Sequence, residues 1–290
     1  MLAAAVESAH HIPVWHAIVL GITQGLSEFL PISSSGHLIL VPWLFNWTEL
    51  MGPANAELNK TLDVALHIGT FLGAAGYFRN DLLRFAGGAI RSIRRRAIVG
   101  DDERIAWLLV LSAVPGALVG ALFSSVIEEN LGQIWLIAVM LVVFGIVLLV
   151  ADRAPERRPV ADFRTRDAVI MGVCQAAALQ PGVSRSGVTI SASRWLEFER
   201  DSAARLSFLM SLPIIGGAGL YKGLQLLTGS GLPPGTAGAF FWGMVSSAVT
   251  GALAVSLVLR IVRTRSFTPF VVYRAIVGLG ALVLLATGVR

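Results

Sequence analysis

The chain has 290 residues, of which 55% are hydrophobic and only 14% are charged, and its formal net charge is +5. A soluble protein of this length carries charges on roughly a quarter of its residues. The composition therefore excludes an ordinary soluble domain and predicts an all-α protein that crosses a membrane several times. The basic excess predicts no nucleic-acid partner, because the arginines concentrate between apolar segments, as they do in membrane proteins.

Six apolar segments are long enough to span a hydrocarbon core of about 30 Å. They cover residues 61–79, 105–127, 134–152, 203–226, 238–260 and 268–289. Two further apolar segments, 13–45 and 168–196, are interrupted by Pro31 and Pro181, so that each half is too short to span alone. Irregular backbone at membrane depth is tolerated where it lines a cavity or is buried in protein. We therefore predict a re-entrant helical hairpin in each of these two segments.

The arginines predict the orientation of the chain. Segments 79–104 and 153–166 are rich in arginine, and the two predicted spans between them place both on one face. Arginine-rich loops face the cytoplasm. By this count the first hairpin opens towards the outside and the second towards the cytoplasm.

The sequence also predicts one membrane domain, 1–290, made of two repeats at about 13–152 and 168–289. The matching segments, each at an offset of 135 residues, are 145–151 with 280–286 and 114–122 with 249–257. Each half contains one hairpin and three spans, and an odd number of spans gives the halves opposite orientations. Inverted-topology repeats of this kind bring interrupted helices together near the middle of the membrane.

The first hairpin carries polar chemistry in an apolar setting. Gln24 and Glu28 are one helical turn apart and share a helix face. Pro31 ends that helix, and the residues that follow are Ser33, Ser34, Ser35, Gly36 and His37. Ionisable groups inside a membrane are costly, so they indicate a functional site. The structural alternatives are a Glu28 satisfied by neighbouring donors and a His37 that is a hydrogen-bonded core residue.

The second hairpin carries a set of phosphate-binding groups. Its turn contains Gly182, Ser184, Arg185, Ser186 and Thr189. The Arg185 guanidinium is always charged and presents a planar fork that matches phosphate oxygens. The start of the following helix adds amide donors and the positive end of a dipole. The alternative is that Arg185 neutralises Glu28 as a structural pair, and the two roles are compatible.

Other polar residues receive structural interpretations. Asp63 and His67 share a helix face and could line the mouth of the site, but a structural role is favoured for both. Asp201 and Arg205 are expected to pair with each other. Arg274 lies near a span end and is expected to extend to the membrane interface.

The two hairpin motifs together resemble those of the undecaprenyl pyrophosphate phosphatase family, also called bacitracin-resistance proteins. The first is similar to an (E/Q)-x-x-x-E signature followed by P-x-S-S-x-G-H, the second matches P-G-x-S-R-S-x-x-T, and the resemblance covers essentially the whole chain. It implies six spans plus two re-entrant hairpins. The implied roles are a divalent-metal and catalytic site at Gln24 and Glu28, a nucleophile at Ser34, a catalytic histidine at His37, and diphosphate binding by Arg185. Substrate contacts are implied for Ser33, Ser35, Gly36, Gly182, Ser184, Ser186 and Thr189.

One departure from the family matters, because many members have Glu where this chain has Gln24. An amide cannot neutralise a cation or take a proton, so Glu28 must supply the carboxylate chemistry alone.

The activity that the resemblance implies is hydrolysis of undecaprenyl diphosphate to undecaprenyl phosphate and inorganic phosphate. That reaction recycles the lipid carrier of cell-wall synthesis, with Mg²⁺ or Ca²⁺ as cofactor, in a bacterial inner membrane, at a site facing the exterior. His37 would serve as general base for Ser34 or for a water molecule, and the sequence leaves open whether the attack is covalent or direct.

Two other functions stay open at this point. Inverted repeats with broken helices are also typical of transporters, which would make the protein a flippase of the polyprenyl phosphate lipid or a carrier of small solutes. The sequence does not decide between a monomer and a homodimer.

Overall fold

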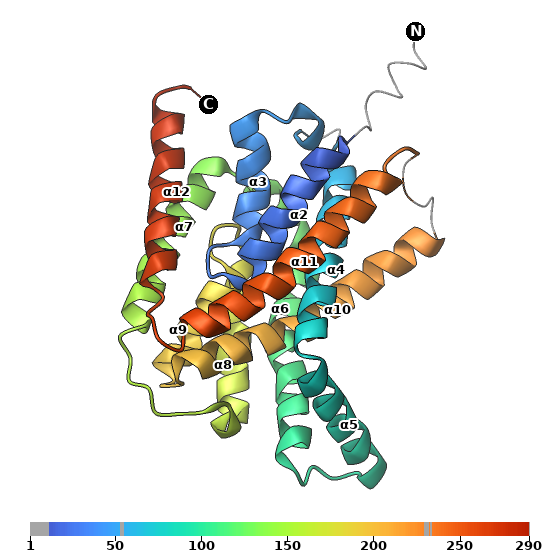
Figure 1. Ribbon diagram of the computed structural model, residues 1–290, viewed down its shortest axis with the longest axis vertical. Helices are drawn as coiled ribbons and strands as arrows, with labels where there is room; N and C mark the ends of the chain where they lie inside the picture. The colour runs from blue at the N-terminus through green and yellow to red at the C-terminus, as the bar shows by residue number, and fades with distance from the viewer. Residues whose placement is uncertain (1–11, 53–54, 229–231, 233, 290) are drawn as a thin grey trace.

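The computed structural model describes residues 12–52, 55–228, 232 and 234–289, apart from the side chains of 124–129 and 226–227. Regular structure within these ranges is helical (Figure 1). The α-helices are α2 (Val14–Phe29), α3 (Ser34–Phe45), α4 (Ala56–Tyr77), α5 (Arg79–Arg95), α6 (Asp101–Asn130), α7 (Ile134–Ala151), α8 (Thr165–Ala176), α9 (Arg185–Trp195), α10 (Arg200–Thr228), α11 (Ala237–Ile261) and α12 (Thr268–Ala286). Short 3-10 helices are η2 (Thr48–Leu50), η4 (Val160–Asp162) and η5 (Ala177–Leu179).

Five of the described helices are long and apolar enough to cross a membrane. These spans are Asp101–Phe123, Ile134–Ala151, Arg200–Gln225, Ala237–Ile261 and Thr268–Ala286. The chain is therefore a multi-pass helical membrane protein, as its composition predicts. The expected span at 61–79 corresponds to α4, which is not among the five, because polar residues such as Lys60, Asp63 and His67 lower its hydropathy.

The arginine-rich segment 79–104 is largely helical rather than a simple loop. It forms α5, which packs against the start of α6 so that the two helices project together from one end of the molecule (Figure 1). Arg84 on α5 joins the two by an ion pair with Asp102, 2.7 Å between Nη2 and Oδ1. The predicted face of concentrated positive charge is thus formed by α5 and the start of α6.

The expected pair between Asp201 and Arg205 is wrong. Arg205 Nη1 lies 2.9 Å from Asp81 Oδ2, and Arg263 Nε lies 3.0 Å from Asp201 Oδ1. Sequence proximity favours a local pair one turn apart, but each charge faces a different neighbouring element. The two ion pairs therefore join α10 to α5 and to the segment that follows α11.

Close helix packing fixes the position of α2. The C-terminal half of the chain supplies α11, which packs along both α2 and α4. A Cβ atom added to Gly25 would lie 1.9 Å from Thr250 Oγ1 and 2.6 Å from the Ser247 carbonyl oxygen. Small residues at such a contact let helix backbones approach closely in a membrane. This contact lies less than one turn from Glu28 and holds it in place.

The two interrupted helical segments share a local structure at the start of their second helix. Ser33 and Ser184 precede α3 and α9 with φ of 77° and 75°, respectively, values unusual for serine. Each side chain caps its helix by accepting a backbone hydrogen bond, from Gly36 and from Gly187. The two turns also touch, because the Gly182 amide donates to Ser33 Oγ at 3.0 Å. The prediction that the two turns come together is confirmed.

A buried guanidinium fastens the two turns to α7. Arg274 on α12 has no exposed surface, so the expectation that it extends to the membrane interface is wrong. It donates to backbone carbonyl oxygens, and their residues are Pro31 (3.0 Å), Met140 (3.2 Å), Leu141 (2.9 Å), Gly182 (2.8 Å) and Val183 (3.1 Å). Three of these oxygens, those of Pro31, Gly182 and Val183, belong to the turns, whose carbonyl groups lack partners within helices, which explains why a cation is retained here.

Candidate active site

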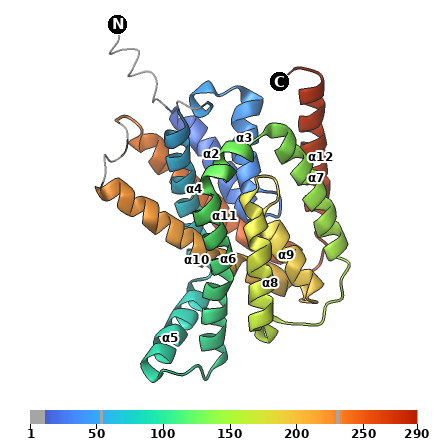
Figure 2. The ribbon, with the colours of Figure 1, turned by 180° about the vertical axis from the view of Figure 1, so that it is seen from behind.

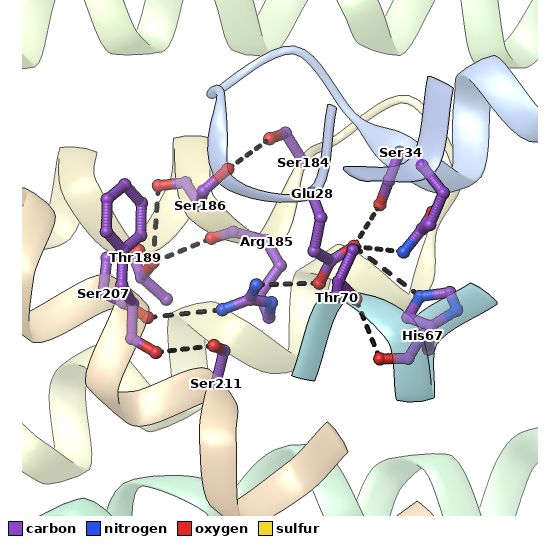
Figure 3. Close-up of polar contacts among 12 residues, drawn as sticks. Glu28, Ser34, His67, Thr70, Ser184, Arg185, Ser186, Thr189, Ser207 and Ser211 are labelled. Carbon is purple, nitrogen blue, oxygen red and sulfur yellow. Dashed lines mark hydrogen bonds and ion pairs between the residues drawn. The ribbon is translucent and has the colours of Figure 1, made fainter. Parts of the chain in front are cut away.

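A cavity of about 170 Å³ lies where the two turns meet α4, α6 and α10. Glu28 is its central charged group and is only 5% exposed (Figure 3). It stands at the end of α2, one residue before the helix terminates at Phe29. A carboxylate buried to this extent requires charged or hydrogen-bonding partners, and the structure supplies them from its own helix, from both turns and from α4.

Arg185 is the partner of Glu28. Its Nη2 donates to Glu28 Oε1 at 2.8 Å, and its Nη1 donates to the Ser207 carbonyl oxygen at 3.3 Å (Figure 3). Arg185 is the first residue of α9, so its guanidinium extends from a helix N-terminus. The guanidinium has five N–H donors in a planar fork, which leaves some of them for an anion in the cavity.

Ser34 is the hydroxyl that contacts this carboxylate. Its Oγ donates to Glu28 Oε2 at 2.6 Å, a short bond of the kind expected for a hydroxyl facing an ionised carboxylate. Ser34 is the first residue of α3, as Arg185 is of α9, and Ser35 lines the same cavity. The N-termini of two short helices therefore converge on one space, an arrangement that favours a bound anion.

Gln24 completes the buried surroundings of Glu28. Its Nε2 donates to Glu28 Oε2 at 3.0 Å, while its Oε1 is buried with no hydrogen-bond partner among the described residues. The amide is thus oriented as a donor to the carboxylate. A glutamate at this position would place a second negative charge beside Glu28, whereas Gln24 donates a hydrogen bond that stabilises the Glu28 carboxylate.

His67 belongs to the site, although a structural role was favoured from the sequence. Its Nε2 lies 3.6 Å from Glu28 Oε2, and its ring lines the cavity (Figure 3). Its Nδ1 lies 2.7 Å from the Asp63 carbonyl oxygen and must donate to it, so Nε2 is the ring nitrogen available to the cavity. Helical spacing from Asp63 indicates a shared face, but only the packing of α4 against α2 shows that this face meets Glu28.

His37 lies behind the first turn instead of in the cavity. Its Nδ1 contacts the Ser33 carbonyl oxygen at 2.7 Å, and its Nε2 contacts Tyr273 Oη at 2.9 Å. The ring also stacks on Tyr273, with 5.5 Å between centroids. The expected contact between His37 and Ser34 is replaced by the bond from Ser34 to Glu28, and His37 holds the turn that carries Ser34.

The remaining predicted residues build the turns. Gly36 and Gly182 lie back to back, since a Cβ atom on Gly36 would be 3.3 Å from the Gly182 amide nitrogen. Ser186 Oγ donates to the Leu30 carbonyl oxygen at 3.1 Å, and Thr189 Oγ1 donates to the Arg185 carbonyl oxygen at 2.8 Å. These residues position the site.

Their places relative to the cavity differ. Of the seven predicted substrate contacts, Ser35 and Ser184 line the cavity beside the catalytic candidates. These two residues differ from the other five in the direction of the side chain within its turn, which residue spacing does not predict.

The residues at the site limit how a divalent cation could bind. Across the described part of the chain, no group of three or more His, Cys, Asp or Glu side chains could hold a metal ion. The Gln24 amide turns its nitrogen towards Glu28, so the expected pair of metal ligands does not fit this geometry. The Glu28 carboxylate and the Ser34 hydroxyl fit a hard cation that takes its other ligands from phosphate and water.

Together these features define a class of protein: a multi-pass membrane protein with a buried carboxylate and a half-buried serine and arginine at one cavity. The residue types are those of a phosphate-ester or anhydride site, with a hydroxyl beside a base and a cation beside both.

Comparison with known sequences agrees with this class. Residues 17–280 match the family described as bacitracin resistance protein BacA, and the chain belongs to that family. A relative from Pelobacter propionicus named undecaprenyl-diphosphatase is 46% identical over 276 residues, covering 94% of this chain and 98% of the relative. Relatives of the same name from Geobacter sulfurreducens and Pelotomaculum thermopropionicum are each 44% identical, covering 91% and 94% of this chain and 96% and 97% of their own lengths.

Proposed function

We propose that this protein hydrolyses undecaprenyl diphosphate to undecaprenyl phosphate and inorganic phosphate. The observation that carries the proposal is the chain of contacts from Ser34 Oγ to Glu28 and from Glu28 to Arg185 in a cavity surrounded by apolar helices. The names of the relatives support the same substrate. A diphosphate on a long apolar tail needs a polar pocket at membrane depth, and this site supplies one.

The contacts favour Ser34 as the nucleophile. Glu28 Oε2 accepts the proton of Ser34 Oγ as Oγ forms a bond to the terminal phosphorus. The bond from that phosphorus to the bridging oxygen breaks, and polyprenyl phosphate leaves with the electron pair. Water then attacks the phosphoserine, Glu28 returns its proton to Oγ, and inorganic phosphate is released. In the alternative, Glu28 activates water directly and Ser34 only orients the phosphate.

Arg185 binds the phosphate and neutralises its charge during both steps of this reaction. Phosphoryl transfer spreads charge over the equatorial oxygens, and most of the catalysis is positioning and charge stabilisation. The guanidinium fork can donate two hydrogen bonds to the phosphate oxygens. The helix N-termini of α3 and α9 add amide donors at the same cavity. A divalent cation carried by the diphosphate, with Glu28 as its protein ligand, would neutralise further charge.

We also propose how the helices cross the membrane. α4 is the sixth span, and α2 with α3 and α8 with α9 form two re-entrant hairpins in an inverted repeat. The similar φ values of Ser33 and Ser184 support the repeat. The arginines of α5 face the cytoplasm of a bacterial inner membrane, and the site opens to the exterior.

Phosphate release from purified, detergent-solubilised protein tests the function, because no transport is possible without a sealed membrane. Release of inorganic phosphate from undecaprenyl diphosphate, lost in Ser34→Ala and Arg185→Lys, is the expected result. An inactive wild-type protein that moves the lipid between leaflets of vesicles would instead favour a flippase. The mass of the protein in the same detergent decides between monomer and homodimer.

A further inference from the structure

A second and larger cavity lies beside the candidate active site. It occupies about 1040 Å³ between α4, α6 and α10, where α10 diverges from the other two helices (Figure 2). Much of its wall consists of small residues, including Ala113, Ala117 and Gly120 of α6 and Gly217 and Ala218 of α10. Small side chains on facing helices leave a smooth apolar groove.

The groove and the active-site cavity share a wall. Ile214 of α10 lines both of them, and Gly116 of α6, which lines the active-site cavity, lies next to Ala117 of the groove. A Cβ atom on Gly116 would be 3.3 Å from the end of the Ile214 side chain. The Ile214 side chain therefore stands between the groove and the active-site cavity that contains Arg185.

The far end of the groove is polar. Lys222 lines it there and donates to Glu57 Oε1 at 2.6 Å. From Ile214 to Gln225, α10 borders the groove for about 16 Å at 1.5 Å per residue. The groove is thus apolar along α10 from Pro213 to Ala218, and this is the end that meets the active-site cavity.

We propose that this groove binds the isoprene units from the second onward and so makes the enzyme selective for long polyprenyl substrates. The inference rests on the proposed function, because the tail is placed by a diphosphate held at Arg185. The wall that the two cavities share at Ile214 and the apolar character of the small residues beside it identify the occupant. The rest of the tail stays in the bilayer.

The chain offers a matched pair of glycines for the test. Gly217 lines the groove, and a Cβ atom added there meets no described atom within 4 Å. Gly223 lies on the same helix outside the groove wall, and a Cβ atom there also meets no described atom within 4 Å. A side chain can therefore leave the backbone at either position without a clash at Cβ, but only Gly217→Trp starts from the groove wall.

The experiment measures kcat/KM in detergent for undecaprenyl diphosphate and for isopentenyl diphosphate. Each buried methylene is worth a factor of roughly four, so displacing two or three carbons predicts a loss of roughly 10- to 100-fold for the long substrate. Activity on the one-unit substrate should stay within about twofold of wild type, and Gly223→Trp should leave both substrates unchanged. Equal effects of the two substitutions on both substrates would overturn the inference. A wild-type protein inactive on both substrates would overturn the proposed function itself.

A labelling experiment gives an independent measurement on the unmodified protein. A prenyl diphosphate with a diazirine on its second isoprene unit should label α6 or α10, and excess undecaprenyl diphosphate should suppress the label. Label found elsewhere, or suppressed equally by bilayer phospholipid, would assign the groove to ordinary lipid and refute the assignment.

Discussion

Replacing Arg185 by lysine tests whether the site needs a fork-shaped cation. The guanidinium uses one nitrogen on Glu28 and another on the Ser207 carbonyl oxygen, and it retains further donors for the substrate. A lysine ammonium keeps the charge but has one nitrogen, which can serve only one of these positions well. The substitution therefore removes geometry and leaves the net charge of the cavity unchanged.

The size of the effect follows from the contact that is lost. Removing one charged donor aimed at the reacting oxygens costs about 2–4 kcal/mol, or roughly 30- to 1000-fold in kcat/KM. The assay is phosphate release from undecaprenyl diphosphate in detergent. Arg84→Lys is the matched control, because Arg84 also pairs with an acidic residue but lies on exposed α5.

Two results would refute this reasoning. Activity of the Arg185→Lys variant within about threefold of wild type would mean that Arg185 acts as a point charge or only balances Glu28. A similar loss in the Arg84→Lys control would show that the exchange acts through folding instead of through the site.

Four further predictions concern the neighbours of this arginine. Glu28→Gln removes the proton acceptor and should lower kcat roughly 10²- to 10⁴-fold; activity near wild type at saturating metal would exclude Glu28 from the mechanism. Gln24→Glu should remain active but depend more steeply on divalent cation, because two carboxylates would then share the site; an unchanged chelator titration would contradict this. Ser34→Ala should abolish a phosphoenzyme that rapid quench traps in the wild type, and adding His37→Ala should lower the activity little further, because His37 holds the turn that carries Ser34; absence of label despite a product burst would leave direct water attack. His67→Asn keeps a donor towards the α4 backbone but loses the nitrogen facing the carboxylate, so kcat should fall about tenfold or more with little change in KM; an unaltered kcat would make His67 structural.

The sequence was sufficient to predict the meeting of the two turns. Polar groups in an apolar chain are costly, so the positions of Glu28 and Arg185 were themselves informative, and their ion pair is observed at 2.8 Å. The serine turns carried a second signal, because Ser33 and Ser184 occupy equivalent places in the two turns. These features depend on local chemistry and on internal repetition, and both can be recognised in the amino-acid sequence.

Other parts of the site depend on which helix faces which, and spacing alone does not predict them. His37 is three residues from Ser34, yet a turn directs their side chains to different partners, Tyr273 and Glu28. His67 is distant in sequence and reaches the carboxylate because α4 packs against α2. Arg274 was expected at the interface because it lies near a span end. Its carbonyl partners come from turns and a helix far away in the chain, which its position in the sequence does not indicate.

The location of Arg274 has a consequence for biosynthesis. It lies on α12, the last described helix of the chain, yet it binds carbonyl oxygens of Pro31 and Gly182, which are made much earlier. During membrane insertion the two catalytic turns are therefore present before the residue that ties them together. The nascent protein should remain without an ordered active site until α12 enters the bilayer, so that hydrolysis begins only after this helix has been inserted.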